Sequence, residues 1–156
     1  MPGDNQITIR DSKAEDFDEV ISLLKQLWPG RKINDNSLRA SFLKSFELKG
    51  HIIRVASTPD KIVGLYSLSI RNNLKVEGNL ANIDELVVDE TMRGQKIGML
   101  LLEDAEVIAR ENGCKSLGLE SSFHREDAHR FYIKNGYEMQ GYYIIRNLEL
   151  PPCGSE

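Results

Sequence analysis

A short basic turn is the segment of this 156-residue chain whose residue types most directly suggest chemistry. Residues 93–98 read Arg-Gly-Gln-Lys-Ile-Gly and stand between a predicted strand and a predicted helix. The first N–H groups of a helix have no partner within it, and the helix dipole adds about half a positive charge there. Arg93 and Lys96 add two cations, and Gly94 and Gly98 let the backbone approach a ligand closely. These features predict a site for a phosphate-like anion.

Two better-known phosphate-binding motifs do not match this turn. A P-loop requires Gly-x-x-x-x-Gly-Lys-Ser/Thr, and no Lys-Ser or Lys-Thr pair directly follows a glycine in the chain. The dinucleotide fingerprint requires Gly-x-Gly-x-x-Gly, which the spacing of Gly94 and Gly98 does not supply. Taken alone, the turn is equally compatible with a plain strand–helix connection.

The turn must be positioned by its flanking elements, in residues 83–112. Residues 86–88, Leu-Val-Val, form the apolar end of a strand, and residues 89–92 break the pattern because Asp and Glu are poor strand formers. From residue 97 onward, apolar side chains recur at spacings of four and three, which predicts a helix with one buried face. Gly113 stands just past its end, where a left-handed residue is common.

The first half of the chain predicts two helices and a strand hairpin. A strand is expected at residues 6–10, followed by a helix that a capping box of Ser12 and Glu15 opens and Pro29-Gly30 ends. The further elements expected here are a helix at 37–49, paired strands at 51–57 and 62–71, and a polar loop at 71–79.

The remaining residues complete a mixed α/β pattern. A strand is expected at 115–120, a helix at 121–135 that Gly136 caps, and closing strand material at 137–150. The order is β-α-α-β-β-β-α-β-α-β, which predicts an α/β (α+β) fold with a mixed sheet flanked by helices.

Composition and charge narrow the classes of function. Apolar residues make up 40% and charged residues 28% of the chain, so we expect one globular domain at residues 1–150 and a short tail at 151–156. The net charge of −4 disfavours nonspecific nucleic-acid binding and mildly favours a cationic substrate. No apolar run of about 18 residues exists, so we expect no membrane partner and a cytoplasmic location.

The histidines do not indicate a metal site. His124 and His129 are five residues apart, which separates them by about 140° around a helix. No cluster of Cys or carboxylate residues completes a set of ligands beside them. We therefore expect no metal, and surface or helix-capping roles for both.

Two motifs at their expected separation make the chain resemble the Gcn5-related N-acetyltransferases. Residues 93–98 and their flanking elements resemble motif A, Gln/Arg-x-x-Gly-x-Gly/Ala, with Arg93 first, Gly98 last and Lys96 where the middle glycine is usual. Residues 128–137, Ala-x-x-Phe-Tyr-x-x-x-Gly-Tyr, match motif B. Arg125 stands where many members carry Asn, three places before that alanine.

The resemblance implies an acyl-CoA N-acyltransferase fold, and transfer of acetyl from acetyl-coenzyme A to an amine by direct attack in a ternary complex. The pyrophosphate of coenzyme A would lie on residues 93–99, at the helix N-terminus. Its amide-rich pantetheine arm would pair like an added strand with the backbone of residues 86–88. The expected cofactor-binding residues are Leu86, Val87, Val88, Arg93, Gly94, Gln95, Lys96, Ile97, Gly98 and Met99.

The same resemblance implies a base and an acid. An ammonium substrate must lose a proton before it attacks, and Asp84 and Glu85 are the adjacent acids on the central strand. Because successive strand side chains point to opposite faces, we expect at most one to face the acetyl group, and we favour Glu85. A water ordered by an acid is the alternative base. Tyr132 matches the tyrosine that protonates the departing thiolate, with a purely structural tyrosine as the alternative.

The acceptor is the least specified part of the reaction. Residues 83–88 and 127–132, with Gly136-Tyr137, resemble the aminoalkylphosphonate N-acetyltransferases in particular, over roughly the second half of the chain. We expect a small primary amine: an aminoalkylphosphonate-like amine, an aminoglycoside or a polyamine. A homodimer is the expected assembly. The alternatives are a protein or peptide N-acetyltransferase, a catalytically idle acyl-CoA-binding sensor, and a protein-interaction module without affinity for coenzyme A.

Overall fold

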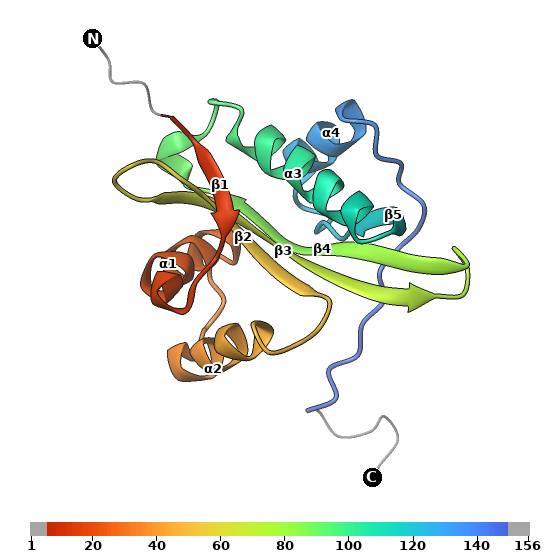
Figure 1. The fold of residues 1–156 in the computed structure, drawn as a ribbon, viewed down its shortest axis with the longest axis horizontal. Helices are drawn as coiled ribbons and strands as arrows, with labels where there is room; N and C mark the ends of the chain where they lie inside the picture. The colour runs from red at the N-terminus through yellow and green to blue at the C-terminus, as the bar shows by residue number, and fades with distance from the viewer. Residues whose placement is uncertain (1–5, 150–156) are drawn as a thin grey trace. The chain divides into compact units, whose positions relative to one another are not determined.

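The computed structural model describes residues 6–149, in two units of residues 6–119 and 120–149. The first unit is built on a five-stranded sheet of order β1-β2-β3-β4-β5 (Figure 1). Neighbouring strands run antiparallel, except that β5 is parallel to β4. The strands are β1 Thr8–Asp11, β2 His51–Ser57, β3 Ile62–Asn73, β4 Gly78–Val88 and β5 Cys114–Leu119. The helices of this unit are η1 Ala14–Asp16, α1 Phe17–Leu27, α2 Asp35–Ser45, η2 Glu90–Met92 and α3 Ile97–Glu111.

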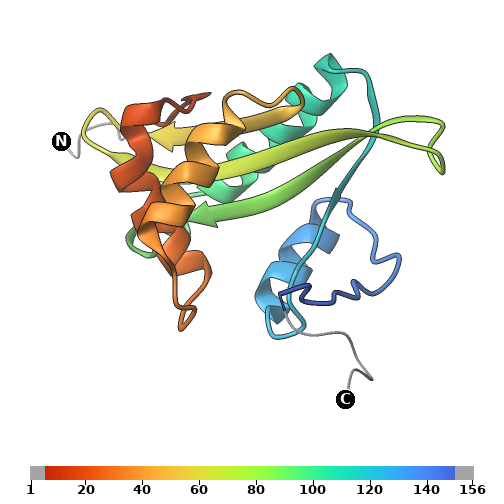
Figure 2. The ribbon, with the colours of Figure 1, turned by 90° about the horizontal axis from the view of Figure 1, so that it is seen from below.

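Helices cover both faces of this sheet. Figure 2 shows α1 and α2 on one face and α3 on the other. Val55, Leu65 and Val87 are register partners on β2, β3 and β4, and they pack with α1 and α2. Because strand side chains alternate, the next row along belongs to the face that α3 covers. The core beneath α1 and α2 consists of Phe17, Val20, Leu23, Leu24, Leu27, Phe42, Val55, Ile62, Leu65 and Val87.

A polar network fastens α3 to the sheet. The Arg54 guanidinium donates to both carboxylate oxygens of Asp104, at 2.9 and 3.1 Å, and the Tyr66 hydroxyl donates to the same carboxylate at 2.7 Å. Asp11 accepts a further guanidinium bond at 3.0 Å. The hydrogen bonds to Asp104 raise the pKa of Arg54, and burial raises the pKa of Tyr66. Both groups therefore stay protonated and keep their donor role at neutral pH.

The predicted strand, turn and helix at the centre of the chain are confirmed. β4 ends at Val88, where the apolar run ends, and α3 begins at Ile97. Gly113 follows α3 with φ of +71°, the left-handed conformation that a glycine adopts without steric cost. Pro29-Gly30 follows the end of α1 as predicted. These elements are set by local periodicity and turn chemistry, which the sequence displays directly.

The predicted capping box of Ser12 and Glu15 is wrong by one residue. Asp16 accepts the backbone N–H of Lys13 at 2.7 Å and the Ser12 hydroxyl at 3.4 Å, and it pairs with Arg10 at 2.8 Å. The hydrogen bonds from Arg10 hold the pKa of Asp16 below its ordinary value. Asp16 is therefore the carboxylate that organises the entry into α1, because it bonds to both the Lys13 backbone and the Arg10 guanidinium.

The predicted polar loop at 71–79 is wrong because most of it continues the hairpin. Arg71 pairs with Leu80 and Asn73 with Gly78, which leaves residues 74–77 as the turn. An antiparallel hairpin tolerates polar side chains where a face meets solvent, so polarity there did not mark a loop. The helix predicted at 37–49 begins earlier, because the Asn34 side chain accepts the Ser37 N–H at 2.9 Å and caps it.

The second unit contains α4, Glu126–Lys134, but not the closing strand predicted at 137–150. Residues 137–149 form no strand, and Leu150 lies outside the described residues. The β-favouring run Tyr-Tyr-Ile-Ile at 142–145 shows why the prediction failed. A strand exists only where its backbone pairs with another strand, and the described part of this unit has none to pair with.

No helix among the described residues is both long and apolar enough to cross a membrane.

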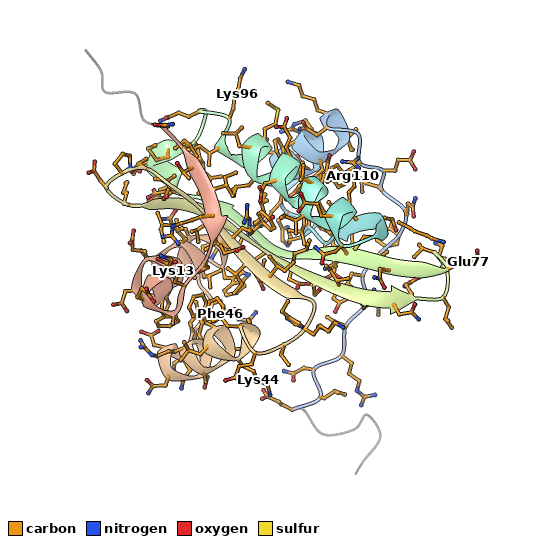
Figure 3. The ribbon with its side chains drawn as sticks, in the orientation of Figure 1. Lys13, Lys44, Phe46, Glu77, Lys96 and Arg110 are labelled. Atoms are coloured by element: carbon orange, nitrogen blue, oxygen red, sulfur yellow. The ribbon has the colours of Figure 1, made fainter. Side chains whose placement is uncertain are left out.

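Because of the network beneath α3, we expect loss of the Asp104 carboxylate to lower the stability of the protein strongly. Asp104→Ala would leave the largely buried Arg54 guanidinium and the Tyr66 hydroxyl without their shared acceptor. We expect the free energy of unfolding to fall by about 3 kcal/mol, as when one member of a buried ion pair is removed. Arg110→Ala, on the exposed end of the same helix (Figure 3), breaks only a surface pair with Glu106 and should cost under about 0.5 kcal/mol. Equal effects of the two substitutions in urea unfolding would contradict this account.

Candidate active site

A β-bulge interrupts the pairing of β3 and β4 at the two candidate acids. Leu68 pairs with Ile83 and Ser67 pairs with Glu85, so Asp84 is one extra residue on β4. A bulge breaks the alternation of side chains and bends the strand that carries it. Ile83 and Glu85 are two residues apart, yet they lie on opposite faces because their partners on β3 are adjacent.

The bulge corrects the prediction that Asp84 and Glu85 point to opposite faces. Glu85 and its partner Ser67 lie on the face that α1 and α2 cover. The Asp84 carboxylate accepts the side-chain amide of Asn82 at 2.8 Å, and Asn82 pairs with Ser69 on that same face. Both acids are therefore presented on one face. Uninterrupted alternation, on which the prediction relied, does not hold at this point of β4.

Ser67 holds Glu85 at two points. The Ser67 hydroxyl donates to the Glu85 carboxylate, and its oxygen lies 3.1 Å from the backbone nitrogen of Glu85, whose N–H it accepts. Burial raises the pKa of Glu85, the hydrogen bond from Ser67 opposes that rise, and the charge of Asp84 adds to it. A carboxylate whose pKa is raised binds a proton more readily near neutral pH. That is the property a general base requires.

The far end of β4 has an open backbone edge. β5 pairs with β4 only as far as Ile83, opposite Leu119, so no strand of the first unit pairs with residues 84–88 on that side. On the other side, Glu85 N–H bonds to Ser67 and Asp89 N–H bonds to Val63 of β3. By alternation, the N–H and C=O groups of Leu86 and Val88 point away from β3, and those of Val87 point toward it.

The turn before α3 contains two left-handed residues. Gly94 has φ of +81°, and Lys96, the residue that precedes the helix, has φ of +63° and ψ of +18°. Lys96 stands where motif A usually carries glycine, and its left-handed conformation has a steric cost that glycine would not incur. Figure 3 shows the Lys96 side chain extending away from the ribbon. Arg93 is also exposed, and the Gln95 amide lies 3.8 Å from the Met92 sulfur.

The first turn of α3 is suited to an anion. In the described part of the chain it has no side-chain cap, and it carries no acidic residue. Its backbone hydrogen bonds start with Leu100 N–H to Lys96 O at 3.1 Å, so the N–H groups of residues 97–99 have no partner within the helix. The Ile97 side chain is 1% exposed and belongs to the core, whereas Gly98 and Met99 are half-buried. Backbone groups are thus the contacts that Ile97 can offer a ligand.

Tyr132 lies on α4, in the second unit. Its ring centroid is 5.3 Å from that of Phe131 and 6.0 Å from that of Tyr137, and its carbonyl accepts the Tyr137 N–H at 3.0 Å. Burial raises the pKa of Tyr132, and the charge of Arg125 partly opposes the rise. The phenol is therefore protonated at neutral pH and able to donate.

Ser67 and Asn82 are site residues that the sequence analysis missed. A signal was present on β3, where one face is apolar at Val63 and Leu65 and then turns polar at Ser67 and Ser69. A polar pair in the middle of a strand that is otherwise buried indicates something to hydrogen-bond. The bulge lies at the adjacent acids Asp84 and Glu85, which interrupt the alternation of polar and apolar residues in β4.

A family match and a curated relative indicate the family of the chain, and a solved structure shows the same fold. Residues 17–137 match the acetyltransferase (GNAT) family. An aminoalkylphosphonate N-acetyltransferase of Salmonella typhimurium is 33% identical over 140 residues, covering 90% of each chain. A glucosamine 6-phosphate N-acetyltransferase of Dictyostelium discoideum is 26% identical and covers 96% of each chain. A solved aminoglycoside N-acetyltransferase in complex with CoA shares the fold, with a TM-score of 0.83 at 17% identity over 96% of this chain and 99% of that one.

The chain therefore belongs to the GNAT acetyltransferase family. It is an acetyl-CoA-dependent N-acetyltransferase, and acetyl-CoA is its co-substrate. The predicted fold class and family resemblance are confirmed.

Because the backbone of Lys96 is in the left-handed conformation, we expect steric strain at this position. Lys96→Gly and Lys96→Ala both remove the charge, but only Ala keeps a Cβ in the left-handed conformation. We expect the glycine variant to be more stable than the alanine variant by about 1 kcal/mol, because glycine adopts positive φ without penalty. Chemical unfolding of the two proteins measures the difference. A more stable alanine variant would show that the turn relaxes out of this conformation.

Proposed function

We propose that this enzyme acetylates a small primary amine, and that its acceptor resembles an aminoalkylphosphonate. The observation that carries this reading is the bulge in β4, which puts two carboxylates on one face beside an open backbone edge. The nature of the acceptor is supported by the 33% identical relative, which is an aminoalkylphosphonate N-acetyltransferase.

Acetyl-CoA supplies the acetyl thioester, and two backbone features support its binding mode. The N–H groups at the start of α3 would hold the pyrophosphate, with Arg93 and Lys96 as surrounding cations. The outward N–H and C=O groups of Leu86 and Val88 would pair with the amides of the pantetheine arm, as an added strand pairs with a sheet edge. Of the predicted strand residues, Val87 contributes its side chain to the core, and its backbone groups face β3.

Glu85 is the proposed base. An ammonium group must lose a proton before its nitrogen can attack a thioester. Glu85 is partly buried, its pKa is raised by that burial, and Ser67 fixes its carboxylate. Asp84 is the more exposed of the two acids, and a role in attracting a cationic amine suits it better than proton transfer.

Tyr132 is the proposed acid. It matches motif B of the family, and its phenol is protonated at neutral pH. A phenol is a weaker acid than a thiol, with ordinary pKa values of about 10 and 8.5. Tyr132 would therefore donate its proton once the carbon–sulfur bond has largely broken and the sulfur carries a full negative charge.

Thiol release from acetyl-CoA tests the acceptor. We expect aminoalkylphosphonates to give a higher kcat/KM than aminoglycosides, polyamines and peptides. Faster turnover of an aminoglycoside or a polyamine would overturn the phosphonate assignment and keep a small-amine enzyme. Turnover of peptides alone would favour the protein acetyltransferase alternative. Binding of acetyl-CoA without release of thiol by any amine would favour the sensor.

If Glu85 is the base, its replacement should lower the rate in a pH-dependent way. Glu85→Gln should lower turnover by about 10²-fold near pH 7, because a positioned general base is lost. The loss should shrink as the pH rises, since free amine then forms without assistance. Asp84→Asn is the matched control on the same face, and we expect it to alter KM more than kcat. Equal and pH-independent rates for the parent and both variants would remove the two acids from the mechanism.

If Tyr132 is the acid, removal of its hydroxyl should lower turnover and leave acetyl-CoA binding largely unchanged. Tyr132→Phe keeps the ring and its contacts with Phe131 and Tyr137, and deletes only the hydroxyl. We expect kcat to fall by about 10² to 10⁴ while the affinity for acetyl-CoA changes little, as when an interaction made chiefly in the transition state is removed. Both quantities should be measured on one preparation. Parental turnover of Tyr132→Phe with the best acceptor would make the phenol structural and water the acid.

A further inference from the structure

We propose that Ser67 is a positioning residue, which keeps the Glu85 carboxylate ionised and fixed in direction by bonding it across the bulge. The proposal deepens the proposed function, since it rests on Glu85 acting as the base. Neither the family motifs nor the resemblance assigns a role to Ser67.

The Ser67 hydroxyl bonds to β4 at the bulge. One residue of β3 faces two residues of β4 at this point, so the regular ladder of backbone bonds is interrupted. The Glu85 N–H donates to the Ser67 side chain at 3.1 Å. The Ser67 hydroxyl therefore supplies a side-chain acceptor for β4 at this interruption. A residue without a side-chain acceptor would remove this bond at a partly buried position.

The same hydroxyl also acts on the carboxylate. Its single hydrogen is donated to the Glu85 carboxylate while its oxygen accepts the Glu85 N–H. The two contacts complement one another, because they tie the backbone and the side chain of one residue to one atom. The side-chain torsions of Glu85 are thereby restricted, which fixes the direction of the carboxylate. A hydrogen bond donated to a carboxylate also favours its charged form over its neutral form.

Among the groups around Glu85, Ser67 is the one that opposes the effect of burial on the Glu85 pKa. Burial and the charge of Asp84 both raise the pKa of Glu85, and the hydrogen bond from Ser67 lowers it. On this face His51 of β2 lies one row away, paired with Ser69. Arg39 of α2 lies over the Phe17 ring, 5.2 Å from its centroid. Within the described residues, no basic group forms an ion pair with Glu85.

Three substitutions separate positioning from a merely structural role. Ser67→Ala removes the hydroxyl, and Ser67→Thr keeps it on a β-branched side chain that suits a strand. Ser69→Ala is the matched control. It deletes the same group two residues along the same strand and face, and Ser69 is paired with Asn82, not with Glu85.

The first measurement needs no turnover. Carbon-13 NMR of glutamate side chains follows the titration of Glu85, which is assigned from the signal missing in Glu85→Gln. We expect the Glu85 pKa to rise in Ser67→Ala and to stay near the parental value in Ser67→Thr and Ser69→Ala. The same midpoint in Ser67→Ala as in the parent would overturn the proposal.

The second measurement is the pH profile of kcat/KM. The acidic limb should move to higher pH in Ser67→Ala, with a loss of roughly tenfold below neutrality that largely recovers at alkaline pH. Ser67→Thr should restore the limb. A pH-independent loss in Ser67→Ala would make Ser67 structural and overturn its positioning role. If Glu85→Gln instead keeps the parental rate, the proposed base has failed, whereas the NMR titration still decides whether Ser67 controls Glu85.

Discussion

The bulge in β4 is the constraint on which the rest of the candidate site depends. One extra residue, Asp84, turns Glu85 onto the face covered by α1 and α2. The pairing of β5 with β4 stops at Ile83, at the same point of the strand. The bulge and the end of that pairing coincide, and a bulge both breaks alternation and bends its strand. Carboxylates gather on one side, and a row of backbone groups remains open at the edge.

The remaining elements hold this irregularity in place. The Arg54–Asp104–Tyr66 network ties α3 to the sheet, so the start of α3 keeps a fixed position relative to β4. On the opposite face, the apolar contacts of α1 and α2 with Val55, Leu65 and Val87 hold the strands in register. Lys96 accepts a left-handed conformation, and Glu85 accepts partial burial of a charge. Both features are locally unfavourable in free energy, and the packing of the surrounding sheet and helices offsets them.

Much of this arrangement could be predicted from the sequence. The spacing of Ile97, Leu101 and Ala105 marked α3, and the basic glycine turn marked its exposed N-terminus. The two family motifs indicated the fold and the acetyl-CoA dependence, which the comparisons confirm. These features are local, so each is expressed within a few neighbouring residues.

The parts that sequence analysis missed depend on pairing between distant segments. The shared face of Asp84 and Glu85 follows from their register against Ser67 and Leu68, which lie on another strand. The role of Ser67 has the same origin. At residues 137–149 the sequence predicted a strand that does not form. The strand-favouring side chains there have no partner strand among the described residues. Propensity indicates what a segment can form, and pairing decides what it does form.

The central claim is that the open edge of β4 and the uncapped start of α3 together bind acetyl-CoA. Amide hydrogen exchange with and without coenzyme A tests it most directly, read at single residues by NMR. The account predicts that exchange slows at Leu86, Val88 and residues 97–99 when the ligand binds. Val87, whose N–H already faces β3, should change little and serves as the internal control. Unchanged exchange at Leu86 and Val88 in a ligand-saturated sample would contradict the account.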